Sequence, residues 1–142
     1  MIRMSRPCAK GGMHALLNTV RARGLRVSAT RRAVLAALDA AEHPLTAGEI
    51  AGAALDAASV YRNLEALEAI GVVHHVHLGR AGRYELRGRT AAWATCEACG
   101  RSTPLGAGAL AGIRVAVGEA CGFDASFAHV PIVGRCPDCR AP

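Results

Sequence analysis

Two C-x2-C pairs near the end of the chain limit its possible folds more than any other feature. Cys96 and Cys99 form the first pair, and Cys136 and Cys139 form the second. Four thiolates in two turns can close a tetrahedron around one Zn²⁺ and leave no coordination position open. Redox-active C-x-x-C motifs are the alternative, but the βαβ context of such motifs is missing. The spacing therefore predicts a structural zinc site.

The length of the chain explains why such a site would be useful. With 142 residues, the chain can bury one moderate core or two small ones, and small cores usually need a metal, disulfides or a partner subunit. The first twelve residues are basic but no apolar stretch follows them directly, so no secretory signal is expected, and disulfides are disfavoured. No apolar run is long enough to cross a bilayer. We expect a cytoplasmic protein without a membrane partner.

Positive charge is concentrated in the N-terminal half. The formal net charge is +6, and eight Arg or Lys residues precede the first Asp, Arg26 and Arg31 among them. Arg31 also falls in the first turn of an expected helix, where positive charge opposes the helix dipole. Both observations favour an anionic partner such as a phosphate backbone, with a solvated basic face as the alternative.

Apolar periodicity divides the first half into helices and a hairpin. We expect helices over residues 14–23, 29–40, 47–53 and 57–70, with Ser28 and Thr46 as N-caps. The last two helices, joined by a short turn, make a helix-turn-helix. Strands over residues 72–78 and 83–86, on either side of a glycine-containing turn, then make a wing.

The second half is expected to form a small α/β domain. A strand-like start carries the first cysteine pair, a helix follows over residues 108–121, and a strand-like run over residues 126–133 leads into the second pair. The expected fold class is α+β. It comprises an N-terminal winged-helix domain (residues 1–87), a hinge (88–92) and a zinc-stapled dimerisation domain (93–142). The last segment holds too little apolar mass to fold well alone, so zinc and a second subunit are expected to stabilise it.

The start of the helix expected over residues 57–70 carries the candidate DNA-reading side chains. N-terminal residues of a recognition helix meet base edges in the major groove. The candidates are Ser59, Tyr61, Arg62 and Asn63. A half-buried core position is the alternative for Tyr61. At the tip of the wing, Arg80 and Arg83 are expected to contact phosphate or the minor groove.

The order of these segments resembles the ferric uptake regulator family of metal-sensing repressors. The resemblance rests on RGLRVSATRRAVLAAL, AEHPLTAGEI, SVYRNLEALEAIGVV, the wing, C-x2-CG and GRCPDC, and it covers about residues 14–140. It implies a homodimeric repressor of metal homeostasis genes, which binds an AT-rich inverted repeat in double-stranded DNA when its sensory metal is loaded. By the same resemblance, Tyr61 and Arg62 contact DNA and the four cysteines hold the structural zinc.

The hinge departs from the pattern of that family. Most members carry a His-rich stretch just before the first C-x2-C, whereas this chain reads RGRTAAWATC, with Ala91 and Trp93 where ligand histidines usually stand. The common regulatory site is therefore expected to be largely missing, and Trp93 is expected to pack at the dimer or domain boundary.

Histidines of the wing are the remaining candidates for a regulatory metal. His75 and His77 are two residues apart on an expected strand, so they project from one face, whereas His74 points the other way. Together with His129, the pair resembles the histidine trio of the family's nickel-responsive branch. The resemblance adds two positions that are ligands in some relatives, Glu85 and His43. Imidazole suits Zn, Ni and Fe, so the ligands leave the metal open.

Other interpretations remain at this stage. The wing histidines can instead contact phosphate or bond to backbone, and His43 can be an ordinary loop histidine. The whole chain can be a family member that has lost metal sensing and binds DNA constitutively or under redox control. It can also be a zinc-stapled protein-interaction module. An enzyme is least expected, because no nucleophile and base pair is visible. Cys8 and Cys121 stand outside the tetrad, and Cys121 is expected to be a small buried residue.

Overall fold

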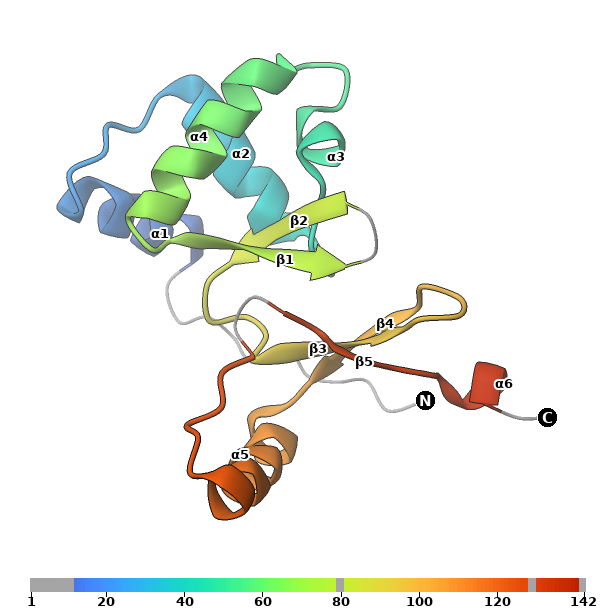
Figure 1. The fold of residues 1–142 in the computed structure, drawn as a ribbon. Helices are drawn as coiled ribbons and strands as arrows, with labels where there is room; N and C mark the ends of the chain where they lie inside the picture. The colour runs from blue at the N-terminus through green and yellow to red at the C-terminus, as the bar shows by residue number, and fades with distance from the viewer. Residues whose placement is uncertain (1–11, 79–80, 128–129, 141–142) are drawn as a thin grey trace.

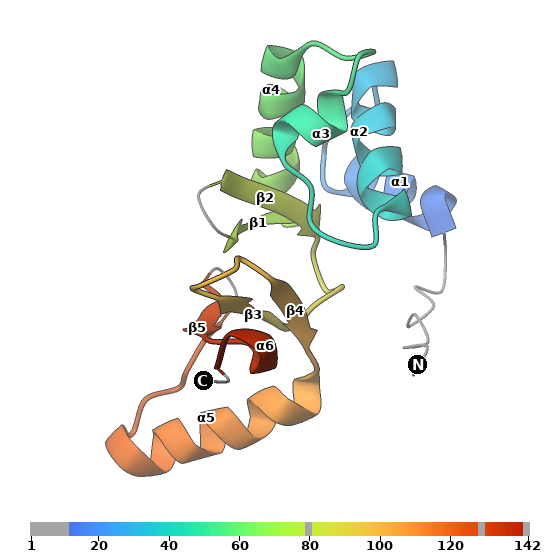
Figure 2. The same cartoon turned by 90° about the vertical axis from the view of Figure 1, so that its right-hand side faces the viewer.

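The structure is a computed structural model that describes residues 12–78, 81–127 and 130–140. The head, which is the N-terminal body in Figures 1 and 2, contains the helices α1 (Gly12–Ala22), α2 (Ala29–Ala40), α3 (Ala47–Ala51) and α4 (Ala57–Ala69) and a hairpin of β1 (Val73–Leu78) and β2 (Ala81–Leu86). The second body contains β3 (Ala92–Cys96), β4 (Ser102–Leu105), α5 (Ala107–Cys121), β5 (Ile132–Gly134) and α6 (Pro137–Arg140). The expected α+β class is confirmed.

The head has one core, which the apolar stripes of its helices build. Leu35 and Leu38 of α2 pack with Val60, Leu64 and Leu67 of α4, and each is at most 2% exposed. Burying a side chain of this size stabilises the fold by about 1.5–3 kcal/mol. The predicted helical stripes are confirmed, and the core fixes the face that α4 turns to solvent.

Side-chain caps set where the helices begin. Ser28 Oγ accepts a hydrogen bond from the backbone N–H of Arg31 (3.1 Å), and Asp56 caps α4 in the same way through Ser59 (2.9 Å). Thr46 forms a capping box with Glu49. The predicted caps are confirmed. The α3 helix ends at Ala51 and not at residue 53, because Gly52 adopts a positive φ of 52°.

The wing is an antiparallel hairpin whose ladder runs from Val73↔Leu86 to Leu78↔Ala81. β2 therefore begins two residues earlier than expected, because residues 81 and 82 pair with β1 and do not belong to the turn. The loop after α2 joins the hairpin through mutual backbone hydrogen bonds between Leu45 and Tyr84. The α4 helix thus packs beside a wing that is tied to α2.

The second body is built on a three-stranded sheet with the order β4-β3-β5, in which β3 pairs antiparallel with β4 and parallel with β5. The prediction of a strand over residues 126–133 is wrong. β5 covers Ile132–Gly134 alone, since only these residues lie beside β3 from Ala94 to Cys96. The described residues before it are irregular, and Val130 is 65% exposed. The sequence pattern did not predict the short elements β4 and α6.

Two sets of side-chain contacts join the bodies. Trp93 of β3 is buried against Val76 and Leu78 of the wing, which agrees with its expected place at a boundary. Arg89, in the segment expected as the hinge, donates hydrogen bonds to the carbonyl oxygens of Leu38, Asp39 and Ala41 at the end of α2, at 2.6–2.9 Å. It also forms an ion pair with the Asp39 carboxylate. A cation at carbonyls left open by a helix end is electrostatically favourable.

None of the described helices is long and apolar enough to span a membrane.

Candidate metal centres and nucleic-acid interface

The four cysteines of the C-x2-C pairs meet at one end of the β4-β3-β5 sheet. Their sulfur atoms all lie within 4.8 Å of one another, and in the described part of the chain no other group of three or more potential ligands is gathered so closely. Cys96 ends β3, whereas Cys136 stands just before α6. Such a set of thiols could hold one metal ion, with every donor coming from the protein.

Hydrogen bonds make the four sulfurs unequal before any metal binds. The pKa of the Cys96 thiol is lowered to about 6, chiefly because the backbone N–H of Cys136 donates to its sulfur at 3.3 Å. The pKa of Cys139 is raised to about 12, chiefly through its hydrogen bond with the Cys136 side chain. A thiolate, not a thiol, is the form that binds a metal. The hydrogen bond from the Cys136 N–H therefore favours the thiolate form of Cys96.

Ion pairs connect the two cysteine turns outside the cluster. Arg101 pairs with Asp138 at 2.7 Å, and Arg135 pairs with Glu97 at 3.2 Å. All four side chains are more than half exposed, so each pair contributes little to stability. They link the segment after β3 to the segment around α6 on the surface of the cluster.

The exposed start of α4 carries the candidate DNA-reading residues. Tyr61 is 51% exposed and is not among the residues that form or pack against the core of the head, which disagrees with a core position. Arg62 is exposed and donates a hydrogen bond to Ser59 Oγ at 3.1 Å. These side chains face solvent because Val60 and Leu64, on the other side of the helix, are buried in the core. The geometry presents a phenol and a guanidinium that could enter a groove.

Asn63 and Arg31 form an internal contact beside that surface. Asn63 donates to the Ser59 carbonyl at 2.8 Å and accepts a hydrogen bond from Nε of Arg31 at 2.9 Å. Arg31 also donates to the carbonyl of Arg26. The structure thus places both residues as a link between α2 and α4, and their contact with DNA stays a prediction. Arg26 itself is exposed.

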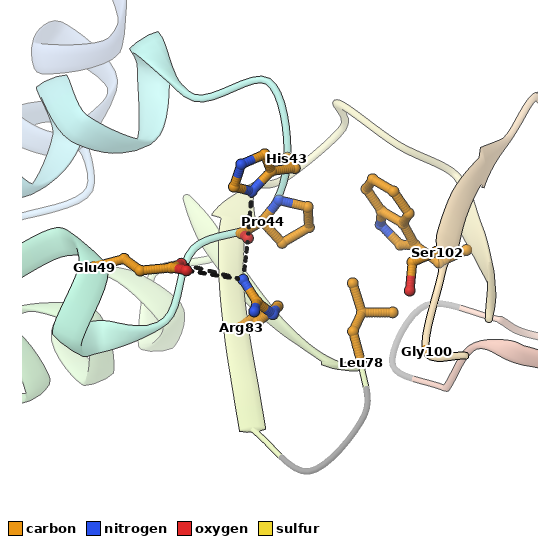
Figure 3. A pocket seen from close by; sticks show the side chains of 8 residues that line it. His43, Pro44, Glu49, Leu78, Arg83, Gly100 and Ser102 are labelled. Atoms are coloured by element: carbon orange, nitrogen blue, oxygen red, sulfur yellow. Dashed lines mark hydrogen bonds and ion pairs between the residues drawn. The ribbon is translucent and has the colours of Figure 1, made fainter. Parts of the chain in front are cut away.

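Arg83 does not lie at the tip of the wing. It turns toward α3, where it donates to the Pro44 carbonyl and pairs with the Glu49 carboxylate, both at 3.1 Å (Figure 3). Its contact with DNA would require giving up these partners, so that role also stays a prediction. Arg80, His129 and Cys8 lie outside the described residues.

The structure brings His75 and His77 together on one face of β1. Their rings lie edge to face with centroids 5.2 Å apart. Nδ1 of His75 contacts a carboxylate oxygen of Glu68, in the last turn of α4. The pattern of alternation predicted the histidine pair, but Glu68 was missed, because no spacing rule connects a helix position with a strand that it contacts in three dimensions.

Glu85 does not join His75 and His77. It faces the other side of the hairpin, where its buried carboxylate contacts Nε2 of His74 at 3.1 Å and accepts a hydrogen bond from Nε1 of Trp93 at 3.3 Å. The cross-strand register His74↔Glu85 causes this placement. The Nδ1 atom of His74 is buried and has no hydrogen-bond partner in the described structure.

His43 lies apart from both the His75–His77 pair and the His74–Glu85 contact. It lines a cleft of about 320 Å³ between the loop after α2, the wing and the second body, together with Arg83, Trp93 and Ser102 (Figure 3). Its Nδ1 atom is 3.1 Å from the Pro44 carbonyl. Neither His75 nor His77 lines this cleft, so the predicted regulatory ligands fall into separate groups.

Cys121 departs from its expectation. It is exposed at the end of α5, where its thiol donates to the Val117 carbonyl at 3.2 Å. The expected buried position is wrong, because α5 buries only Leu110 against the rest of the chain.

Comparisons with known proteins agree with this architecture. Residues 27–76 match a family of helix-turn-helix domains. A search of curated proteins finds no match. A ferric uptake regulator structure from Helicobacter pylori shares 18% identity with a TM-score of 0.71, and the match covers 92% of this chain and 95% of that chain. A structure from Pseudomonas aeruginosa, with manganese, shares 25% identity with a TM-score of 0.67, covering 85% and 97%. One from Vibrio cholerae shares 19% identity with a TM-score of 0.65, covering 84% and 98%.

The matches extend over both bodies of the chain and nearly the whole length of each solved structure. The helix-turn-helix match falls on α2 to β1, which includes the exposed start of α4. The chain therefore has the fold of the ferric uptake regulators, with an N-terminal helix-turn-helix domain and a four-cysteine cluster near its C-terminus.

Proposed function

We propose that this protein is a metal-responsive transcriptional repressor of the ferric uptake regulator family, which acts in the cytoplasm as a homodimer and controls metal homeostasis genes. The observation that carries the proposal is the helix-turn-helix whose recognition helix, α4, presents Tyr61 and Arg62 to solvent in a chain of net charge +6. A basic head with exposed side chains at the start of such a helix suits an operator in double-stranded DNA.

The DNA contacts in this proposal come from α4, from the basic residues around it and from the wing. Tyr61 and Arg62 read base edges, while the remaining cations contact phosphates and set the register on the duplex. The full proposed set is Ser59, Tyr61, Arg62, Asn63, Arg26, Arg31, Arg80 and Arg83. Two heads in a homodimer would read an inverted repeat.

The structural metal in this proposal is Zn²⁺ at Cys96, Cys99, Cys136 and Cys139. Tetrathiolate coordination without an open position suits zinc. The domain limits that go with it are residues 1–87 for the head, 88–92 for the hinge and 93–142 for the dimerisation domain. Arg89 supports a hinge that is attached to the head.

The regulatory metal is assigned to the wing, with His75 and His77 as ligands and His129 as a third. Zn²⁺, Ni²⁺ and Fe²⁺ all suit imidazole. The Helicobacter pylori regulator is described as having three functional metal binding sites, which supports a site beyond the cysteine cluster. Glu85 and His43 are less suited, since Glu85 already contacts His74 and Trp93 and His43 lines another cleft.

The test is binding of the full chain to operator DNA with Zn²⁺, Ni²⁺, Fe²⁺ or Mn²⁺ added in turn, while the cysteine-bound metal is retained. One of the metals is expected to raise the affinity, and His75→Ala/His77→Ala is expected to remove that response. An unchanged response in the double variant would refute the wing site. A steep fall of affinity with salt, together with preference for one operator, would exclude a protein-interaction module.

A second candidate is a repressor that has lost metal sensing and binds DNA constitutively or under redox control. The observation in its favour is Trp93, which directly follows the hinge, at a position where the resemblance expects a ligand histidine. Trp93 donates a hydrogen bond to Glu85, a carboxylate that the resemblance marks as a ligand in some relatives. In that case, DNA affinity should be the same with and without a chelator that spares the cysteine-bound metal.

A further inference from the structure

Glu68 connects the recognition helix to the wing. It stands in the last turn of α4, and its carboxylate contacts Nδ1 of His75 on β1. The two side chains are 30% and 36% exposed, so the contact lies at the edge of the head and is reachable from solvent. The core already fixes α4 against β1, and this polar contact adds a second connection, at the histidine pair.

A carboxylate at Nδ1 decides which nitrogen of the ring can bind a metal. When Nδ1–H donates to the carboxylate, the lone pair of the neutral imidazole is on Nε2. Histidines that bind metals commonly donate their other N–H to a carboxylate, which fixes the tautomer and makes the ring more basic. Glu68 stands in this relation to His75.

Glu68 lies on the same face of α4 as Tyr61, one of the proposed DNA-reading residues. Glu68 and Tyr61 are seven residues apart, close to two helical turns, so they share a face. Tyr84 belongs to the wing and is the cross-strand neighbour of His75. The pKa of Tyr84 is raised, mainly by burial and then by the charge of Glu68.

We propose that Glu68 is a positioning residue for a divalent cation held by His75 and His77, and that it couples this cation to the recognition helix. The proposal rests on the wing metal assigned above and adds how that metal would act. The signal would pass inside the head, from β1 to Glu68 and along α4 to Tyr61.

Binding of the cation requires a rotamer change of His77 and no rearrangement of the backbone. The ring centroids of His75 and His77 are 5.2 Å apart, but among the described residues the four cysteines are the only group of three or more potential ligands gathered closely enough to hold a metal ion. His77 is exposed, and exposed side chains change rotamer in picoseconds to nanoseconds. His77 would turn toward the metal, while Glu68 holds His75 in place.

The experiment measures Ni²⁺ binding by calorimetry to the full chain with its cysteine-bound metal retained. Glu68→Ala is expected to weaken binding by about 10–100-fold. Glu68→Gln should restore part of the affinity, since its amide oxygen can still accept the Nδ1–H hydrogen bond. The matched control is Glu65→Ala, which removes an exposed carboxylate of the same helix and should leave Ni²⁺ affinity unchanged.

A spectroscopic readout separates positioning from a purely structural role. Proton–nitrogen NMR correlations of the imidazoles should show His75 as the Nδ1–H tautomer in the unaltered protein without Ni²⁺, and this preference should be lost in Glu68→Ala. Ni²⁺ should also raise operator affinity less in Glu68→Ala than in Glu65→Ala. Thermal unfolding and metal content confirm that each variant is folded.

The outcomes distinguish this proposal from the one on which it rests. If Glu68→Ala binds Ni²⁺ normally while His75→Ala/His77→Ala does not, Glu68 is only an ion-pair partner and the positioning role is refuted, although the wing site stands. If the double histidine variant also binds Ni²⁺ normally, the wing site itself is absent and both proposals fail.

Discussion

At the scale of single residues, Glu49 shows how one side chain can serve both a helix and a wing. Its carboxylate accepts the backbone N–H of Thr46 at 2.8 Å, which closes the capping box of α3, and it pairs with Arg83 of β2. The pKa of Glu49 is lowered, first by the Thr46 N–H and, with burial acting against it, by the charge of Arg83. The ionised carboxylate is therefore the form that stabilises the head.

We predict that Glu49→Gln lowers the free energy of unfolding by about 0.5–1 kcal/mol at pH 7, a value kept small because the carboxylate is partly exposed. Since the pKa is lower in the folded state, this stabilisation is complete above the ordinary pKa of a glutamate. It is lost as pH falls through the lowered pKa of the folded protein. Urea unfolding at a series of pH values should show the variant and the unaltered protein converging in acid. Glu42→Gln, at an exposed loop position, should have the same free energy of unfolding as the unaltered protein across this pH series.

Arg62 provides a second prediction at this scale. If it reads a base edge, Arg62→Ala should weaken operator binding by about 1–3 kcal/mol and relax the preference at one base position. A fluorescence anisotropy titration against an operator and single-base variants of it would measure both effects. Arg140→Ala removes the same charge from the exposed end of α6, in the other body, and should leave binding unchanged. Uniform weakening on all sequences would reassign Arg62 to phosphate contact.

At the scale of elements, the sequence predicted the features that neighbouring residues determine. It missed the pairings and contacts between residues that are far apart in the chain. The bounds of α2 were predicted to the residue, because Ser28 caps its start and a continuous apolar stripe runs along it. β5 was misplaced, because a strand of three residues is defined by its pairing with β3 and not by its own pattern. The contacts of Glu68 with His75 and of Trp93 with Glu85 were missed for the same reason, since each joins elements that only the fold brings together.

The β4-β3-β5 sheet should depend on the cysteine-bound metal. Apart from Leu110, the buried apolar residues in the described part of this body all belong to β3, so the strands have little core of their own. We predict that chelation, or Cys139→Ser, removes amide hydrogen-exchange protection from β3 and β5 but leaves α2 and α4 protected. Cys121→Ser is the matched control, because it removes a thiol outside the cluster. Full protection of β3 without metal would show that the cluster is not a structural site.

At the scale of the whole molecule, the second body leaves much apolar surface uncovered. Val115, Phe123, Val130 and Val133 are 59–71% exposed. Apolar side chains exposed in such number commonly mark an interface. A second copy of the chain packed on α5 and β5 would cover this surface and place two heads on one DNA duplex.

We predict that Val115→Asp shifts the protein from dimer to monomer, because a carboxylate buried in an apolar interface is costly. Sedimentation velocity would measure the change in mass, and affinity for an inverted repeat should fall while affinity for a single half-site is retained. Ala36→Asp, at an exposed position on α2, should leave the mass unchanged. A Val115→Asp protein that remains dimeric would place the interface elsewhere.

The position of Trp93 makes the protein its own optical reporter. It is the single tryptophan of the chain and is 7% exposed, between Val76 and Leu78 at the contact of the two bodies. An indole in such apolar surroundings emits at shorter wavelength than one in water. Any event that parts the wing from β3 should therefore shift the emission to the red. Intrinsic fluorescence alone, without a dye or label, can follow whether metal or DNA opens this contact.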